Sequence, residues 1–139
     1  ARLRADGIDA IVFGDIHLAD VRAYRESRLA GTGIEPLFPL WGSDSLLLVE
    51  EMLEGGLRCV ITCLDPARVD PALAGTELTR ETVRRLPAQV DPCGENGEFH
   101  TFAFDGPMFR HPLRIRPGAV VERDGFVFAD ILPAEPFGQ

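Results

Sequence analysis

The fold class of this chain follows from one early stretch, Ile8-Asp9-Ala10-Ile11-Val12-Phe13-Gly14-Asp15. Its centre is a nearly continuous apolar run with β-branched residues, which is typical of a strand buried on both faces of a parallel sheet. A helix is expected next, from Asp15 as its N-cap to about Ala30, because Gly31 and Gly33 follow as stop signals. A buried strand that leads into a helix predicts an α/β fold.

The alternation continues over the next fifty residues. Residues 35–42 contain two prolines and the single tryptophan, and we expect them to form a stiff apolar loop. Ser43 is expected to cap an amphipathic helix that ends at Gly55-Gly56, and residues 58–64 read as a second buried strand. This pattern predicts a Rossmann-like parallel sheet with flanking helices, incomplete in this chain, over residues 1–66.

The character of the sequence changes after residue 66. Asp70-Pro71 is expected to start one short helical turn, and Thr79 to cap another helix that Pro87 stops. From Val90 onward the chain is rich in strand-forming residues, and Asp124-Gly125 is a strong two-residue hairpin signal. We therefore predict a smaller α+β subdomain over residues 67–139.

Composition excludes several classes of protein. The chain has 139 residues, 22 of them acidic and 14 basic, for a net charge of -8, and every basic residue is arginine. This balance argues against non-specific nucleic-acid binding, and no apolar stretch approaches the ~20 residues that a membrane span needs. An odd count of three cysteines is typical of a reducing compartment, so we predict a cytoplasmic protein.

The densest polar segment is Asp91-Pro92-Cys93-Gly94-Glu95-Asn96-Gly97-Glu98-Phe99-His100-Thr101. Carboxylates and an imidazole are groups that accept protons or orient an amine, and the two glycines allow the backbone to approach a ligand closely. The same string also fits a plain turn, because Asn96-Gly97 is a favoured hairpin sequence whose neighbouring glutamates would be solvated. Spacing alone leaves both interpretations open.

A second polar group closes the first strand. Gly14-Asp15 lies where ligands bind in open α/β sheets, although Asp15 could simply cap the next helix. The string Gly14-Asp15-Ile16-His17 is also similar to the Gly-Asp-x-His segment of metallophosphoesterases, which hold two metals with further His, Asp and Asn ligands. Only His100 and His111 remain for that purpose, so we predict no metal site.

Several of these strings together match one family. They are Gly14-Asp15-Ile16, Arg22 with Glu26, the segment 33–42, the segment 91–102 and Asp105-Gly106-Pro107. In this combination the chain resembles the diphthine–ammonia ligase family, also called the diphthamide synthase domain, from about Gly7 to Phe109. Gly-Glu-Asn-Gly-Glu-Phe-His-Thr is the specific part of the match. Arg22 and Glu26 either line the cleft or form an ion pair, and we expect the ion pair.

The resemblance implies a PP-loop ATPase of the adenine nucleotide alpha-hydrolase superfamily. Such an enzyme uses ATP, with Mg²⁺, to adenylate a carboxylate that ammonium then converts to an amide. The carboxylate is diphthine on translation elongation factor two in archaea and eukaryotes. The family's Ser-Gly-Gly-Lys-Asp-Ser loop is absent from this lysine-free chain, which is therefore expected to be the C-terminal part of a family member and inactive by itself.

The resemblance also implies roles for the parts of the chain. Residues 1–66 would be the C-terminal part of the nucleotide-binding domain, and residues 67–139 the substrate-binding subdomain. A non-catalytic module that binds ATP or AMP is the alternative to a ligase, and a homo-oligomer is left open. The expected site residues are Glu95, Glu98 and His100 for catalysis, Gly14 and Asp15 for the nucleotide, and Gly94, Asn96, Gly97 and Thr101 for the substrate.

Overall fold

The computed structural model of this protein describes residues 2–134. The chain divides into two compact units, with the boundary between Asp44 and Ser45. None of the helices in the described part combines the length and the apolar character needed to cross a lipid bilayer.

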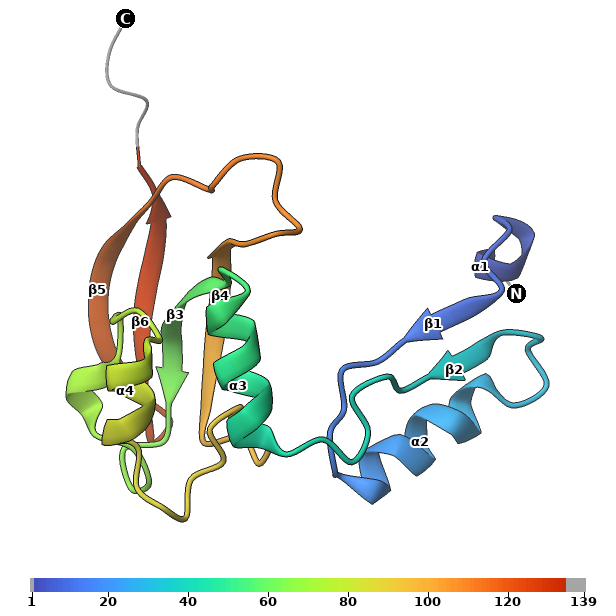
Figure 1. The fold of residues 1–139 in the computed structure, drawn as a ribbon, viewed down its shortest axis with the longest axis horizontal. Coiled ribbons are helices and arrows are strands. Elements are labelled where there is room, and N and C mark those ends of the chain that lie inside the picture. The colour runs from blue at the N-terminus through green and yellow to red at the C-terminus, as the bar shows by residue number, and fades with distance from the viewer. Residues whose placement is uncertain (1, 135–139) are drawn as a thin grey trace, which may run out of the picture. The chain divides into compact units, whose positions relative to one another are not determined.

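The first unit is built around a short parallel pair of strands (Figure 1). Its elements are α1 (Arg2–Ala5), β1 (Ala10–Val12), α2 (Ala19–Leu29) and β2 (Glu35–Leu37). β1 and β2 run parallel with α2 as the connection between them, whereas the opening stretch predicts only the strand and the helix. The expectation that this strand is buried on both faces is wrong, since Val12 is 64% exposed.

The second strand of this pair lies where we expected a loop. Pro36 lacks an N–H group, but the hydrogen bonds to β1 are made by its neighbours. The Glu35 N–H donates to the Asp9 carbonyl, and the Leu37 carbonyl accepts from the Phe13 N–H. Because alternate residues of a strand point their backbone groups to opposite sides, Pro36 costs this pair no bond.

The second unit is an antiparallel sheet with helices packed on one face. Its strand order is β4-β3-β6-β5, and every pairing in it is antiparallel. Along the chain its elements are α3 (Ser45–Glu54), β3 (Arg58–Leu64), the 3-10 turn η1 (Pro71–Leu73), α4 (Arg80–Arg85), β4 (Phe99–Asp105), β5 (Ile115–Arg123) and β6 (Phe126–Pro133).

One apolar core holds the second unit together. Ile61 and Leu64 of β3 are fully buried at its centre, and Val49 of α3 is almost as well covered. Val127 of β6 and Leu73 of η1 belong to the same cluster. The helices α3 and α4 therefore pack against the face of the sheet that carries these residues (Figure 1).

The position of β3 corrects our domain boundary. We placed residues 58–64 in the parallel sheet and the boundary after residue 66, whereas β3 pairs antiparallel with β4 and β6 in the second unit. α3 joins the same unit, which begins at Ser45. An apolar run predicts a strand that is buried, but it does not determine the direction of its neighbours.

Several local predictions are confirmed. The Asp70 carboxylate accepts a hydrogen bond from the Ala72 N–H at the start of η1, and the Thr79 hydroxyl accepts one from the Thr82 N–H at the start of α4. β5 and β6 form a hairpin through Asp124 and Gly125, at φ 53° and 81°. With a parallel pair in one unit and helices on a sheet in the other, the α/β fold class is confirmed.

Candidate functional site

The polar segment 91–98 forms a compact loop that leads into β4. Two tight turns follow one another, since the Gly94 N–H donates to the Asp91 carbonyl and the Gly97 N–H to the Gly94 carbonyl. Gly94 has φ 69°, and a Cβ atom there would lie 2.7 Å from the carbonyl oxygen of Phe99. Only glycine fits this position, because a side chain would meet both the unfavourable φ and the backbone.

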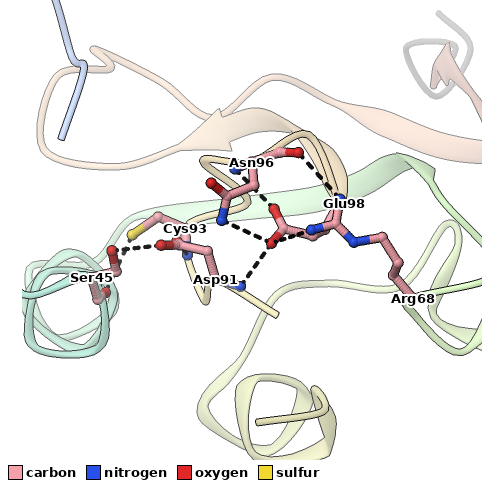
Figure 2. Close-up of polar contacts among 6 residues, drawn as sticks. All are labelled: Ser45, Arg68, Asp91, Cys93, Asn96 and Glu98. Carbon is pink, nitrogen blue, oxygen red and sulfur yellow. Dashed lines mark hydrogen bonds and ion pairs between the residues drawn. The ribbon is translucent and has the colours of Figure 1, made fainter. Parts of the chain in front are cut away.

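The carboxylate of Glu98 lies at the centre of this loop (Figure 2). Its Oε1 accepts a hydrogen bond from the Asp91 N–H at 3.0 Å, and its Oε2 accepts one from the Asn96 N–H at 3.0 Å. The Asn96 side-chain amide donates to Oε1 at 3.2 Å. The Arg68 guanidinium lies 2.9 Å from Oε1, while the Glu98 side chain itself is 0% exposed. Glu98 thus ties both arms of the loop to one buried charge.

This environment keeps Glu98 ionised. Burial by itself raises the pKa of the carboxyl group, but hydrogen bonds from the backbone N–H groups of Asp91 and Glu98 and from the Asn96 side-chain amide, with the charge of Arg68, together lower the pKa below its ordinary value. A buried carboxylate with a lowered pKa is a weak proton acceptor. The geometry therefore supports a positioning role for Glu98, in place of the proton transfer that we expected from the sequence.

The loop is also attached to the start of α3. The two oxygens of the Asp91 carboxylate accept hydrogen bonds from the Cys93 N–H at 2.7 Å and from the Ser45 hydroxyl at 2.9 Å. The Cys93 thiol donates to the Ser45 carbonyl at 3.3 Å. Sequence reasoning did not single out Ser45 or Arg68, because each is distant in sequence from the loop and neither belongs to a polar motif.

The remaining predicted residues of this segment fall into two groups. Asn96 and Gly97 are exposed at the loop surface and Glu95 is half-buried beside them. On β4, His100 pairs with Cys63 and Thr101 with Ile61, so that the side chains of His100 and Thr101 point to opposite faces of the sheet.

Thr101 faces the helices, and His100 faces away from them. The Thr101 side chain lines a cavity of about 110 Å³ under α3, together with Cys59 and Phe99. Burial raises the pKa of the Cys59 thiol, and a hydrogen bond with Thr101 offsets part of that effect. The structure therefore does not bring His100 and Thr101 into one site.

In the first unit, Asp15 is buried by an ion pair. Both of its oxygens are engaged by Arg25, through Nε at 2.5 Å and Nη2 at 3.0 Å, and Asp15 is only 9% exposed. The Arg25 guanidinium also lies 4.6 Å from the centre of the Phe13 ring. Our alternative expectation that Asp15 caps the helix is wrong, since the N-cap of α2 is Leu18.

A second arginine of α2 also contacts aromatic rings of the first unit. Arg22 forms the predicted ion pair with Glu26 at 2.9 Å and lies over the rings of Phe38 and Trp41. The Phe13 and Phe38 rings stack with centroids 5.4 Å apart.

Gly14 and Asp15 do not by themselves form a nucleotide site. Gly14 leaves open space where a side chain would be, so the backbone can be approached there. A triphosphate needs cationic groups, but Arg22 and Arg25 are already held by carboxylates and rings. Within residues 2–134 no group of three or more His, Cys, Asp and Glu side chains is arranged to hold a metal ion.

The second unit and its loop are those of a known family. The family described as Diphthamide synthase C-terminal domain matches residues 44–130, a range that starts one residue before the second unit. The match covers more than half of the chain, and the chain belongs to this family.

Individual relatives agree with the family. The chain is 29% identical over 132 residues to the diphthine–ammonia ligase of Danio rerio, covering 89% of this chain and 51% of that protein. It is 27% identical to the diphthine–ammonia ligase of Bos taurus and 26% identical to that of Homo sapiens, covering 89% of this chain and 48% of each relative. The chain thus spans about half the length of these curated relatives.

Proposed function

We propose that this chain serves the substrate side of an ATP-dependent carboxylate–ammonia ligase of the diphthine–ammonia ligase type. In such an enzyme an activated carboxylate, formed as an acyl-adenylate, is attacked by ammonia to give an amide. The observation that carries the proposal is the loop 91–98, whose shape is fixed by the buried Glu98 carboxylate in a chain of this family. Such a preorganised loop suits a site that orients reactants.

In this proposal the residues of the loop have different roles. Glu98 acts as a positioning residue, and the surface that it holds in place contains Glu95, Asn96 and Gly97. Ammonium must lose a proton before it can attack, and Glu95 is the carboxylate at the surface of the loop that would accept it. His100, exposed on β4, is the second candidate for proton transfer.

The substrates follow from the relatives and not from the described residues. The relatives are named diphthine–ammonia ligases, so the proposed carboxylate is diphthine and the proposed amine is ammonia. The resemblance in sequence adds translation elongation factor two as the bearer of diphthine and ATP-Mg²⁺ as the co-substrate. The first unit would belong to the nucleotide-binding domain, with Gly14 beside the nucleotide. Groups that hold the triphosphate would come from the part of the relatives that this chain does not span.

The test uses the natural full-length protein. Pyrophosphate release and amide formation are measured with ATP, Mg²⁺, ammonium and a panel of carboxylates that includes diphthine-bearing elongation factor. Glu95→Gln is expected to lower amide formation by ~100-fold, the scale of one positioned acid–base group, without changing the circular dichroism spectrum. Glu122→Gln, an exposed glutamate of β5, is the matched control. Absence of pyrophosphate release with every carboxylate contradicts the proposal.

A non-catalytic ATP- or AMP-binding module is the second candidate. One observation favours it: the buried carboxylates of Asp15 and Glu98 are both engaged by arginines within the chain. Such a protein would bind nucleotide without turnover, and Glu95→Gln or His100→Gln would leave nucleotide affinity unchanged. Isothermal titration with ATP and AMP, run beside the pyrophosphate assay, separates the two functions.

A further inference from the structure

The two edge strands of the sheet in the second unit differ in how they are protected against pairing with a further strand. β5 contains Pro117, a register shift between Pro117 and Val120, and charged residues near both of its ends. Such features commonly prevent another strand from joining a sheet edge. β4, at the opposite edge (Figure 1), has no proline and no Lys, Arg, Asp or Glu between Phe99 and Phe104. The edge of β4 is therefore the one that another chain can extend.

The backbone of β4 presents hydrogen-bonding groups on its outer side. The carbonyls of Glu98 and His100 point toward β3, because they accept hydrogen bonds from the N–H of the residue that follows β3 and from the Thr62 hydroxyl. Backbone groups alternate in direction along a strand, so the N–H and C=O groups of Thr101 and Ala103 point to the outer edge. Within residues 2–134 no hydrogen bond is made to these outward groups.

The open part of this edge adjoins the loop 91–98. His100, Thr101 and Phe102 are all exposed. A strand whose only open side is one face buries every second residue, so three exposed neighbours indicate that the edge itself is uncovered in the described chain. Thr101 lies about 10 Å along the strand from Glu98, at a rise of about 3.4 Å per residue. A chain paired beside Thr101 would thus pass close to the loop surface.

One face of an added strand would also meet a groove. Phe102 lines a groove of about 600 Å³ together with Leu113 and Leu132, on the face of the sheet that the helices leave open. Side chains alternate between the two faces of a sheet, so every second side chain of an added strand would lie beside Phe102. In peptides that bind a sheet edge, backbone hydrogen bonds supply affinity and such alternate side-chain contacts supply specificity.

We propose that the outer edge of β4 binds an extended segment of the protein substrate as an additional strand, and so brings the carboxylate of that protein to the loop 91–98. The inference rests on the proposed function, since it takes the partner to be the protein that carries the carboxylate. An extended polypeptide has the alternating N–H and C=O groups that match those of Thr101 and Ala103. A second copy of this chain is a poorer partner, because two copies that each carry a net charge of -8 repel one another.

The first experiment uses the natural full-length protein, labelled with ¹⁵N, and a synthetic peptide that copies the diphthine-bearing segment of elongation factor two. The peptide is expected to shift the backbone amides of Thr101, Phe102 and Ala103 in heteronuclear NMR spectra. Two further peptides carry N-methyl groups on alternate residues, one on each of the two sets. Only one set of N–H groups can face β4, so one methylated peptide should lose binding and the other should keep it. Absence of shifts along β4, or equal binding of the two methylated peptides, overturns the proposal.

The second experiment changes the edge itself. Proline is tolerated on an edge strand where the N–H points outward, so Ala103→Pro should fold while it removes one outward donor. The measured quantity is the ratio of kcat/KM for amide formation on diphthine-bearing elongation factor to kcat/KM on free diphthine. Ala103→Pro should lower this ratio by about tenfold, the scale of a lost backbone hydrogen bond. Glu122→Pro on β5, an edge that already contains Pro117, is the matched control and should leave the ratio unchanged. An unchanged ratio in Ala103→Pro contradicts the proposal.

The results separate this proposal from the proposed ligase function. Amide formation on the elongation factor without any peptide contact at β4 would overturn the edge contact and leave the ligase function standing. Peptide binding at β4, with no pyrophosphate release on any carboxylate, would do the reverse. Sedimentation velocity examines the second copy, since a dimer that Ala103→Pro abolishes would assign the edge to self-association and overturn the proposal.

Discussion

Replacing Glu98 by glutamine removes one charge and turns one acceptor into a donor, at a position with no access to water. A glutamine can present its oxygen to the Asp91 N–H or to the Asn96 N–H, but its NH₂ group then faces the other N–H. One buried backbone donor is left without a partner, at a cost of roughly 1–3 kcal/mol. The remaining hydrogen bonds lose their charge assistance, and the ion pair with Arg68 is lost.

The expected total is about 3 kcal/mol of lost unfolding free energy, at the lower end of what breaking a buried ion pair costs. The Arg68 side chain is 38% exposed, so its own contribution is discounted for solvent screening. Against a typical domain stability of roughly 5–15 kcal/mol, such a loss is readily measured. We expect Glu98→Gln to fold with a clearly lower urea midpoint.

The dependence on pH separates the charge from the shape of the side chain. Since the pKa of Glu98 in the folded protein is lowered, its stabilising contribution is complete above the unfolded pKa of about 4.3 and is lost as the pH falls through the folded pKa. The stability difference between the natural protein and Glu98→Gln should therefore be constant above pH ~5 and narrow below pH ~4.

Urea unfolding followed by far-ultraviolet circular dichroism is the appropriate assay. The single tryptophan, Trp41, lies in the first unit, so its fluorescence reports on that unit and not on the loop. Glu122→Gln makes the same chemical change at an exposed strand position and should cost less than about 0.5 kcal/mol. A loss of less than about 1 kcal/mol for Glu98→Gln, or a difference that does not narrow in acid, would refute the reasoning.

Three other outcomes are expected. Gly94→Ala should lower the free energy of unfolding by more than about 2 kcal/mol, because its Cβ would meet a backbone oxygen at 2.7 Å. Gly97→Ala, also at positive φ but in open space, should lower it by about 1 kcal/mol in the same urea assay. Arg25→Lys loses one of the two hydrogen bonds to Asp15, so Trp41 fluorescence should show that the first unit unfolds at a lower urea concentration. An unchanged urea midpoint would mean that this ion pair contributes nothing to the stability of the first unit. Burial raises the pKa of the Cys63 thiol, and a nearby arginine offsets part of this effect. Iodoacetamide at pH 8 should therefore alkylate Cys63 more slowly than it alkylates free cysteine, which mass spectrometry can measure.

Part of the candidate site was predictable and part was not. The segment 91–101 stands out in the sequence because its polar residues and glycines are dense, and the structure shows a tightly turned loop there. The alternative that its glutamates are solvated fails for Glu98, which is fully buried. Its role as the centre of the loop depends on Arg68, and no pattern within a short window connects two residues so far apart in the chain.

What the sequence alone determined is the local structure: the turn that Asp124-Gly125 makes, the helix start at Thr79, and the helical segment that ends before Gly55-Gly56. These signals act through hydrogen bonds and backbone angles within a few residues, so they need no distant partner. Only the tertiary structure decided that β3 joins an antiparallel sheet and that Glu98 is buried. Strand pairing and burial depend on segments that are far apart in sequence, and an apolar strand is equally suited to either kind of sheet.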